Sequence, residues 1–89
     1  MNVYKIFKEV ELFNKNSKTT DKKIIYFQEY GLKEETYTTL KEFEHWYRII
    51  KPSCLADAIL YNNVDKVADD YYVLHIEDNT FIINIVRFN

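Results

Sequence analysis

Hydrophobic and polar residues alternate most regularly at the C-terminal end of the chain, over residues 71–88. This alternation predicts two β-strands, and Asp78-Asn79 between them tolerates the positive φ of a two-residue hairpin turn. Pairing around that turn places Leu74 opposite Ile83 and gathers six apolar side chains on one side of a sheet: Tyr72, Leu74, Ile76, Phe81, Ile83 and Ile85. The other side would carry a mixed surface that is available for function: Tyr71, Val73, His75, Glu77, Thr80, Ile82, Asn84 and Val86.

Residues 2–13 fit two patterns. Alternating apolar positions favour a strand, interrupted by Lys8, whereas Val3, Phe7 and Val10 would equally line one face of a helix. We favour the strand because residues 14–23 are polar and residues 24–30 are rich in β-branched and aromatic side chains. Residues 2–31 are therefore predicted to form an N-terminal hairpin with a long basic connection, and a polar link over residues 33–38 should follow.

The middle of the chain predicts two helices, over about residues 39–51 and 53–68. Thr39 and Glu42 form a capping box at the start of the first helix, and Pro52 ends it. The face expected to be buried carries Leu40, Phe43, Trp46 or Tyr47, and Ile50. Ser53 is expected to cap the second helix, in which we favour a break or an irregular turn near Asn62-Asn63.

These elements predict one α+β domain over residues 1–89. The sheet would be antiparallel with about four strands, in the order ββααββ, and the two helices would pack on one face. The composition is 47% hydrophobic and 17% aromatic, which favours a folded chain over a disordered one.

Charge and candidate chemistry disfavour several classes of function. The net charge of −2 argues against general nucleic-acid binding, which needs a dominant basic patch. The only cysteine, Cys54, excludes an intramolecular disulfide and is expected to be buried. His45 and His75 lie on separate elements, and one glycine cannot build a phosphate loop. We therefore expect no enzyme activity, no metal and no cofactor. Short apolar runs, and charges interleaved with apolar residues near the N-terminus, predict a soluble cytoplasmic protein without a membrane partner.

Acidic and aromatic residues concentrate between residues 65 and 78. Carboxylates can compete for the arginines and lysines that hold phosphates, and tyrosines are enriched at protein interfaces. We therefore predict a protein-binding surface formed by Asp65, Asp69, Asp70, Tyr71, Tyr72, His75, Glu77 and Asp78.

In size, composition and lack of catalytic motifs, the chain resembles the compact proteins that phages and mobile elements encode against host defences. This resemblance implies an inhibitor that blocks a host nuclease or CRISPR effector in the host cytoplasm. Two alternatives stay open. One is a small-ligand or nucleotide-binding module that acts as a homodimer through the second sheet face, and the other is a structural subunit of a larger assembly.

Overall fold

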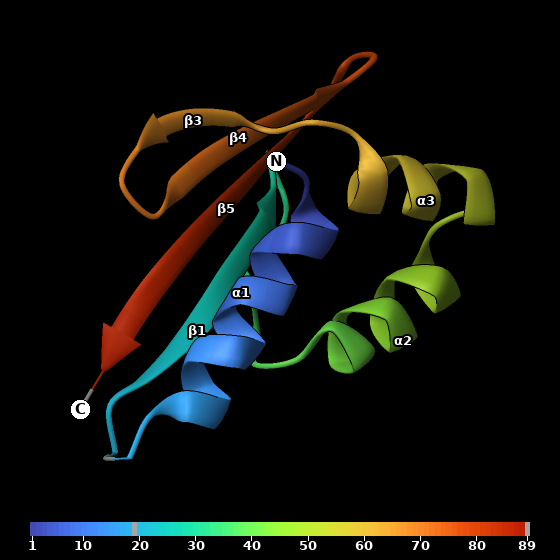
Figure 1. Ribbon diagram of the computed structural model, residues 1–89. Coiled ribbons are helices and arrows are strands. Elements are labelled where there is room, and N and C mark those ends of the chain that lie inside the picture. The colour runs from blue at the N-terminus through green and yellow to red at the C-terminus, as the bar shows by residue number, and fades with distance from the viewer. Residues whose placement is uncertain (19, 89) are drawn as a thin grey trace.

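The structure is a computed structural model that describes residues 1–18 and 20–88. Over these residues the chain forms three helices and five strands: α1 (Val3–Asn16), β1 (Lys22–Glu29), β2 (Glu35–Tyr37), α2 (Leu40–Ile50), α3 (Ser53–Tyr61), β3 (Asp65–Ala68), β4 (Tyr71–Ile76) and β5 (Asn79–Phe88). Figure 1 shows β1 and β5 running alongside each other, with α1 along β1 and with α2 and α3 beside it. None of the described helices is long and apolar enough to cross a membrane.

The strands form one antiparallel sheet in the order β2-β1-β5-β4-β3. Buried side chains of β1, β4 and β5 all project to the face that the three helices cover, because directly paired residues share a face. The predicted α+β class, antiparallel sheet and helices on one face are confirmed. The described residues form five strands and three helices, however, and not about four and two.

Aromatic rings form the centre of the core. Phe27 of β1 is fully buried, and its ring centroid lies 5.0 Å from that of Phe43, 4.8 Å from that of Tyr47 and 5.7 Å from that of Phe81. These contacts tie α2 to the two central strands. The position of α2 is therefore fixed by ring packing.

The N-terminal segment is a helix, so the strand predicted over residues 2–13 and the hairpin over residues 2–31 are wrong. Asn2 caps α1, because its side-chain oxygen accepts a hydrogen bond of 2.8 Å from the Lys5 amide. The buried residues of α1 follow the helical spacing i, i+3, i+4, i+7: Val3, Ile6, Phe7 and Val10. Leu12, which the strand pattern would bury, is 58% exposed. The complete helical stripe therefore outweighs the alternation.

The strand predicted over residues 24–30 is confirmed as β1, but its partners are β2 and β5. β2 lies inside the segment that was predicted to be a polar link, and Tyr37 is the side chain that this short strand buries. The predicted helix over residues 53–68 is also too long. α3 ends at Tyr61, at the expected break near the Asn pair, and β3 follows it.

The C-terminal hairpin has the predicted faces but a different register. Leu74 lies opposite Phe81 and not opposite Ile83, and the turn lies at Glu77-Asp78. Glu77 takes the positive φ, at 53°, which sequence rules assign to Asn, Asp or Gly. A shift of two residues keeps every side chain on its predicted face, because the side-chain period of a strand is two.

The start of α2 confirms the expected cap with one difference. The Thr39 hydroxyl accepts a hydrogen bond from the Glu42 amide at 3.2 Å. The Glu42 carboxylate accepts from the amide and the hydroxyl of Thr38, both at 3.0 Å, so the reciprocal bond of the cap goes one residue earlier than predicted. These bonds, the Thr38 amide foremost, lower the pKa of Glu42. α3 lacks the predicted cap: Pro52 is the N-cap residue, and no side-chain hydrogen bond closes it.

Asn14 of α1 closes part of the edge of β1. β2 covers this edge only at residues 25–27. Beyond it, the Asn14 side chain accepts a 2.8 Å hydrogen bond from the Lys23 amide and donates one of 3.0 Å to the Lys23 carbonyl. One carboxamide therefore makes the two bonds that a neighbouring strand would make, which protects the edge against further pairing.

Replacing Asn14 by Ala should destabilise the fold by about 2 kcal/mol, because two part-buried backbone groups lose their partner. Urea unfolding followed by circular dichroism measures this change. Asn16→Ala is the matched control, because Asn16 is exposed at the last residue of the same helix. Equal effects of the two substitutions would contradict the role of Asn14.

Candidate functional site

The structure divides the predicted acidic residues between two turns. Asp69 and Asp70 lie in the turn between β3 and β4, and Glu77 and Asp78 lie in the turn between β4 and β5. The two turns flank β4, whose six residues span about 20 Å. Asp65 begins β3, and Asp69 forms an ion pair of 3.1 Å with Lys66. All five carboxylates are exposed, but they do not form one cluster.

The three predicted non-acidic residues lie on two faces of the sheet. Tyr71 and His75 are on the face without helices, where Tyr71 is opposite Asn84 and His75 is opposite Thr80. The Nδ1 atom of His75 lies 3.3 Å from the Thr80 hydroxyl oxygen. Tyr72 projects to the helix-covered face and packs against the core. One flat partner surface therefore cannot contact both tyrosine rings.

The face without helices is an open, half-buried surface. It carries apolar side chains from β1, β4 and β5: Ile24, Tyr26, Tyr71, Val73, Ile82 and Val86. Over residues 1–18 and 20–88, no helix lies on this face. The second sheet face predicted from the sequence thus exists, and β1 extends it.

Large apolar side chains also gather at the C-terminal half of α2, where the sequence predicted a buried face. Tyr47 is buried, but Trp46 is 53% exposed and Ile50 is 63% exposed. Trp46, Ile49 and Ile50 form a second, exposed stripe at the spacing i, i+3, i+4. Tyr30 and Leu32, after β1, are exposed too. We call Leu32, Trp46, Ile49 and Ile50 the apolar surface.

A pocket of about 440 Å³ opens beside the apolar surface. Side chains from β1, β2, α2 and the connection between β1 and β2 line it: Glu29, Leu32, Lys33, Glu35, Tyr37, Trp46, Tyr47, Ile50 and Lys51. Three of these residues are aromatic, and we call this site the aromatic pocket. Because Leu32, Trp46 and Ile50 belong to both, the pocket and the apolar surface are continuous.

The most buried rings of the pocket are held by the core. Tyr47 stacks on Phe43 at 4.5 Å between ring centroids, and Tyr37 meets Tyr47 edge-on at 6.2 Å. Burial raises the pKa of Tyr37 to about 12. Burial also raises the pKa of Tyr47, and the nearby Tyr37, Glu29 and Glu35 raise it further. These two rings are therefore fixed, neutral walls.

One ion pair crosses the pocket. Lys51 Nζ lies 2.6 Å from Glu29 Oε2, and the two side chains are only 18% and 14% exposed. Such a pair is less screened by water than a surface pair. The ion pair joins the end of α2 to the end of β1, and the charges of Lys51 and Glu29 compensate each other.

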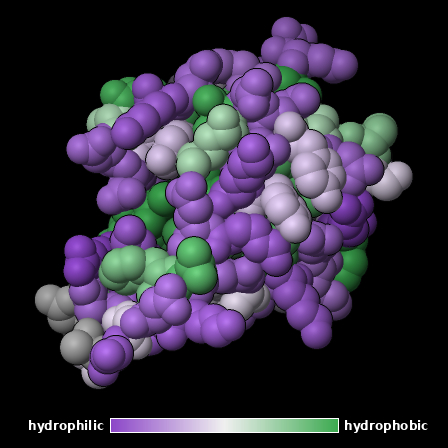
Figure 2. Space-filling model, in the orientation of Figure 1, coloured by the Kyte–Doolittle hydropathy of each residue, from purple (hydrophilic) through white to green (hydrophobic). Residues whose placement is uncertain are grey.

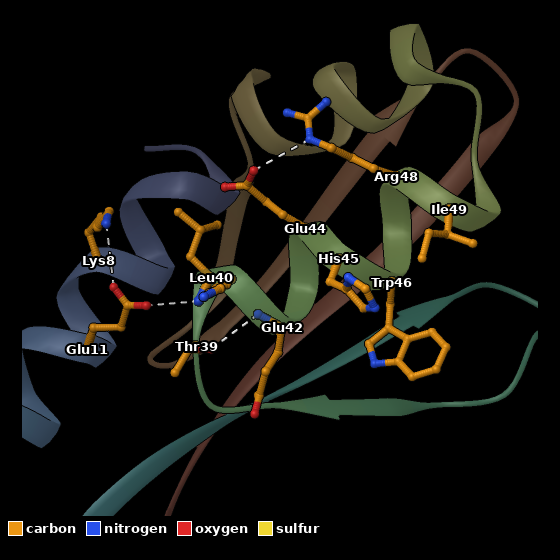
Figure 3. A pocket seen from close by; sticks show the side chains of 11 residues that line it. Lys8, Glu11, Thr39, Leu40, Glu42, Glu44, His45, Trp46, Arg48 and Ile49 are labelled. Atoms are coloured by element: carbon orange, nitrogen blue, oxygen red, sulfur yellow. Dashed lines mark hydrogen bonds and ion pairs between the residues drawn. The ribbon is translucent and has the colours of Figure 1, made fainter.

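A wider groove of about 910 Å³ runs along the other side of α2 towards α1 (Figure 3). Several of its charged groups bind neighbouring helices or each other. Glu11 accepts a 2.9 Å hydrogen bond from the Leu40 amide and lies 3.6 Å from Lys8. Arg48 pairs with Glu44 at 3.5 Å and with Asp57 at 2.9 Å. This groove therefore serves chiefly to join the helices.

Two further predictions concern reactive residues. Cys54 is exposed, contrary to the expectation that it is buried. His45 lies on the exposed side of α2, where its ring contacts Trp46 at 5.8 Å between centroids. Within residues 1–18 and 20–88, no group of three or more His, Cys, Asp or Glu side chains could hold a metal ion.

The sequence held a signal for the apolar surface. α2 has apolar residues at positions 40, 43, 46, 47, 49 and 50, more than one stripe of an 11-residue helix can bury. Treating Trp46 and Tyr47 as alternatives for the same buried position hid that excess. Figure 2 shows that the surrounding helix-covered face is largely hydrophilic. Trp46, Ile49 and Ile50 are exposed on this face, and large apolar side chains exposed together mark interaction sites.

Comparisons with protein-family models, with curated proteins and with solved structures found no match to this chain.

Proposed function

We propose that this protein acts by binding another protein, through the apolar surface and the aromatic pocket. The observation that carries the proposal is the stripe of Trp46, Ile49 and Ile50, which is exposed on a helix whose opposite side is fixed in the core. Tryptophan and tyrosine are enriched among residues that contribute most to binding. A partner that covered the stripe would remove the exposed parts of three large side chains from water, at about 1–2 kcal/mol each.

The rigid support of the surface favours binding. Phe43 and Tyr47 anchor α2 from below, so little conformational entropy is lost when the exposed stripe is covered. The Glu34 and Glu35 side chains are exposed next to Leu32 and supply negative charge beside the apolar residues. A surface with this combination fits a partner with an apolar patch and basic residues at its edge.

We further propose that binding inhibits the partner, and that the partner is a host defence protein such as a nuclease or a CRISPR effector. A small chain that covers a basic nucleic-acid channel needs no catalytic group, because it competes with phosphates for the same arginines and lysines. The acidic turns at residues 69–70 and 77–78 flank the whole length of β4, and we assign them a lesser, electrostatic share in this contact.

Site-specific photocrosslinking tests this proposal. A photoreactive phenylalanine at Ile49 should crosslink the partner in host lysate, whereas the same group at Glu9, which is exposed on α1 and lines neither pocket of α2, should not. The partner identified by this crosslink should lose its nucleic-acid cleavage activity when the wild-type protein is added at a 1:1 molar ratio. Equal crosslinking from both positions, or a partner that keeps full activity, would reject the proposal.

Replacing Trp46 by Ala should weaken binding to that partner by 10-fold or more, because a packed aromatic anchor is lost. Dissociation should become faster while association changes little, which surface-captured binding kinetics can resolve. If the Trp46→Ala variant bound the partner as tightly as the wild-type protein does, the contact would have to lie on another face.

Asp69→Asn combined with Asp70→Asn should instead slow association, and only at low salt.

The open sheet face favours a second candidate function, a small-ligand or nucleotide-binding module that acts as a homodimer. Val73 and Ile82 lie opposite each other there and are only half-buried, so a second copy could cover them. Sedimentation equilibrium of the wild-type protein and of Ile82→Lys separates the two functions. A dimer that Ile82→Lys dissociates would support the second candidate, and a monomer at 100 µM would reject it.

A further inference from the structure

The aromatic pocket is a slot between rings. Tyr37 and Tyr47 are 5% and 8% exposed and form its inner side. Trp46 extends from α2 towards the strands on the far side of the helix from Glu44 and Arg48, as Figure 3 shows. Over the described residues its ring contact is with His45 and not with either tyrosine. The indole and the two phenol rings therefore line one space without filling it.

Two carboxylates face this slot from the sheet. Glu35 is directly opposite Phe27 in the β1–β2 pairing, and Glu29 is two residues beyond Phe27 on β1, so both project to the helix-covered side with the Phe27 ring. Both also raise the pKa of the Tyr47 hydroxyl, as negative charges close to it do. Lys51 compensates the charge of Glu29, so Glu35 is the carboxylate of this wall that can attract a cation into the pocket.

The pocket is lined by two lysines as well as by two glutamates, so its formal charge is zero. Lys51 is held by Glu29 at 2.6 Å, and these two charges largely cancel. Lys33 and Glu35 are both exposed, Lys33 in the connection between β1 and β2 and Glu35 on β2. Among residues 1–18 and 20–88, Glu35 forms no ion pair, so its carboxylate is available to a ligand.

We propose that the aromatic pocket binds an arginine side chain of the partner, with the guanidinium stacked on the Trp46 indole and hydrogen-bonded to the Glu35 carboxylate. This inference rests on the proposed protein-binding function and names the chemistry of its contact. Aromatic faces attract cations, and a planar guanidinium both stacks on a ring and donates two parallel hydrogen bonds to a carboxylate. An anion would meet the negative ring faces, and a leucine would bury Glu35 without a partner.

The predicted ligand agrees with the proposed inhibition. Proteins that hold nucleic acids use arginine for many of their phosphate contacts. An arginine inserted between Trp46 and Glu35 cannot bind a phosphate at the same time. Capture of one such side chain would therefore add direct competition to the steric cover that the apolar surface provides.

The protein's only tryptophan makes the pocket directly observable, because Trp46 lines it. N-acetyl-arginine methylamide, titrated to 50 mM at constant ionic strength, should shift the Trp46 emission and its indole N–H resonance in a saturable way. The leucine analogue should bind at least 5-fold more weakly, and the glutamate analogue should cause no saturable shift. A glutamate or leucine analogue that matches the arginine analogue, or no shift with any of the three, would overturn the inference.

Glu35→Gln should weaken binding of the arginine analogue at least 3-fold, and Glu34→Gln is the matched control, because Glu34 is the adjacent exposed carboxylate and does not line the pocket. Equal binding by both variants and the wild-type protein would reject the role of Glu35. The Ile49 crosslink is a separate readout. A positive crosslink with a failed arginine titration removes only this inference, whereas a failed crosslink removes the proposed function.

Discussion

Leu74→Asp should unfold the protein, whereas Val73→Asp should leave it folded. Leu74 is 1% exposed and projects into the core, where an unpaired carboxylate costs several kcal/mol. The whole stability of a chain of this size is about 5–10 kcal/mol, so this one substitution removes most of it. Val73 is adjacent in the sequence but lies on the open face, half-buried, opposite Ile82 of β5.

The Val73 substitution should cost about 1 kcal/mol, because β-propensity falls and the new carboxylate meets Asp65 directly across the β3–β4 pair. Circular dichroism and urea unfolding at 25 °C measure both variants. Ile83→Asp, at a fully buried position of the partner strand β5, should repeat the Leu74 result. If all three variants lost the same stability, the helix-covered and open faces of the sheet would be assigned wrongly.

The faces of this hairpin could be predicted, but its register could not. Alternation along residues 71–88 decides which side chains point inward, and it says nothing about a shift of two residues. Turn chemistry placed the turn at Asp78-Asn79, because Asn tolerates positive φ better than Glu does. In the structure Glu77 accepts that conformation. In this register Ile83 is paired with Tyr72 of β4 on one side and with Phe27 of β1 on the other. The pairing with β1 joins segments that are far apart in the sequence, so the local pattern does not contain it.

The N-terminal error has a similar origin. Residues 2–13 contain both periods, and the polar stretch and the strong strand that follow made a hairpin the simpler interpretation. The deciding facts were the Asn2 cap and the burial of Ile6 together with Phe7, which a strand with one buried face does not permit. The local sequence pattern cannot decide between the two periods, because the surface that buries Ile6 and Phe7 belongs to α2, α3 and the sheet.

The candidate site was the least predictable part. Acidic residues near one another in the sequence lie in two separate turns, because β4 runs between them. The apolar surface and the aromatic pocket instead combine α2 with β1, β2 and their connection, none of which carries a motif. Composition predicted a protein interface, and the residues that we assign to it follow from the burial of Tyr47 and the exposure of Trp46.

The stability of the protein should fall steeply above pH 10, and Tyr47→Phe should remove a large part of that fall. Tyrosine in an unfolded chain ionises near pH 10. Burial raises the pKa of Tyr37 to about 12 and raises that of Tyr47 further. Between pH 10 and the folded-state pKa, the unfolded chain has lost a proton that the folded chain keeps. Unfolding therefore becomes more favourable as pH rises, and the stability present below pH 10 is lost.

The size of the effect follows from the pKa difference. For Tyr37, a rise from 10.0 to about 12 corresponds to about 2–3 kcal/mol once the pH exceeds the folded-state value. The pKa of Tyr47 is raised further, by burial first and then by the nearby Tyr37, Glu29 and Glu35, so Tyr47 should contribute at least as much. Together they account for a large share of a stability of about 5–10 kcal/mol. The wild-type protein should therefore be largely unfolded near pH 12.

Urea midpoints measured from pH 8 to pH 11.5 test this linkage. Because other groups also ionise at high pH, the informative quantity is the difference between variant and wild type at each pH. Tyr30→Phe is the matched control, because its ring is 78% exposed in the folded state. The Tyr47→Phe curve should diverge from the wild-type curve above pH 10, and the Tyr30→Phe curve should not. Parallel curves for all three proteins would mean that water reaches the Tyr47 hydroxyl, and the fixed aromatic wall of the pocket would have to be abandoned.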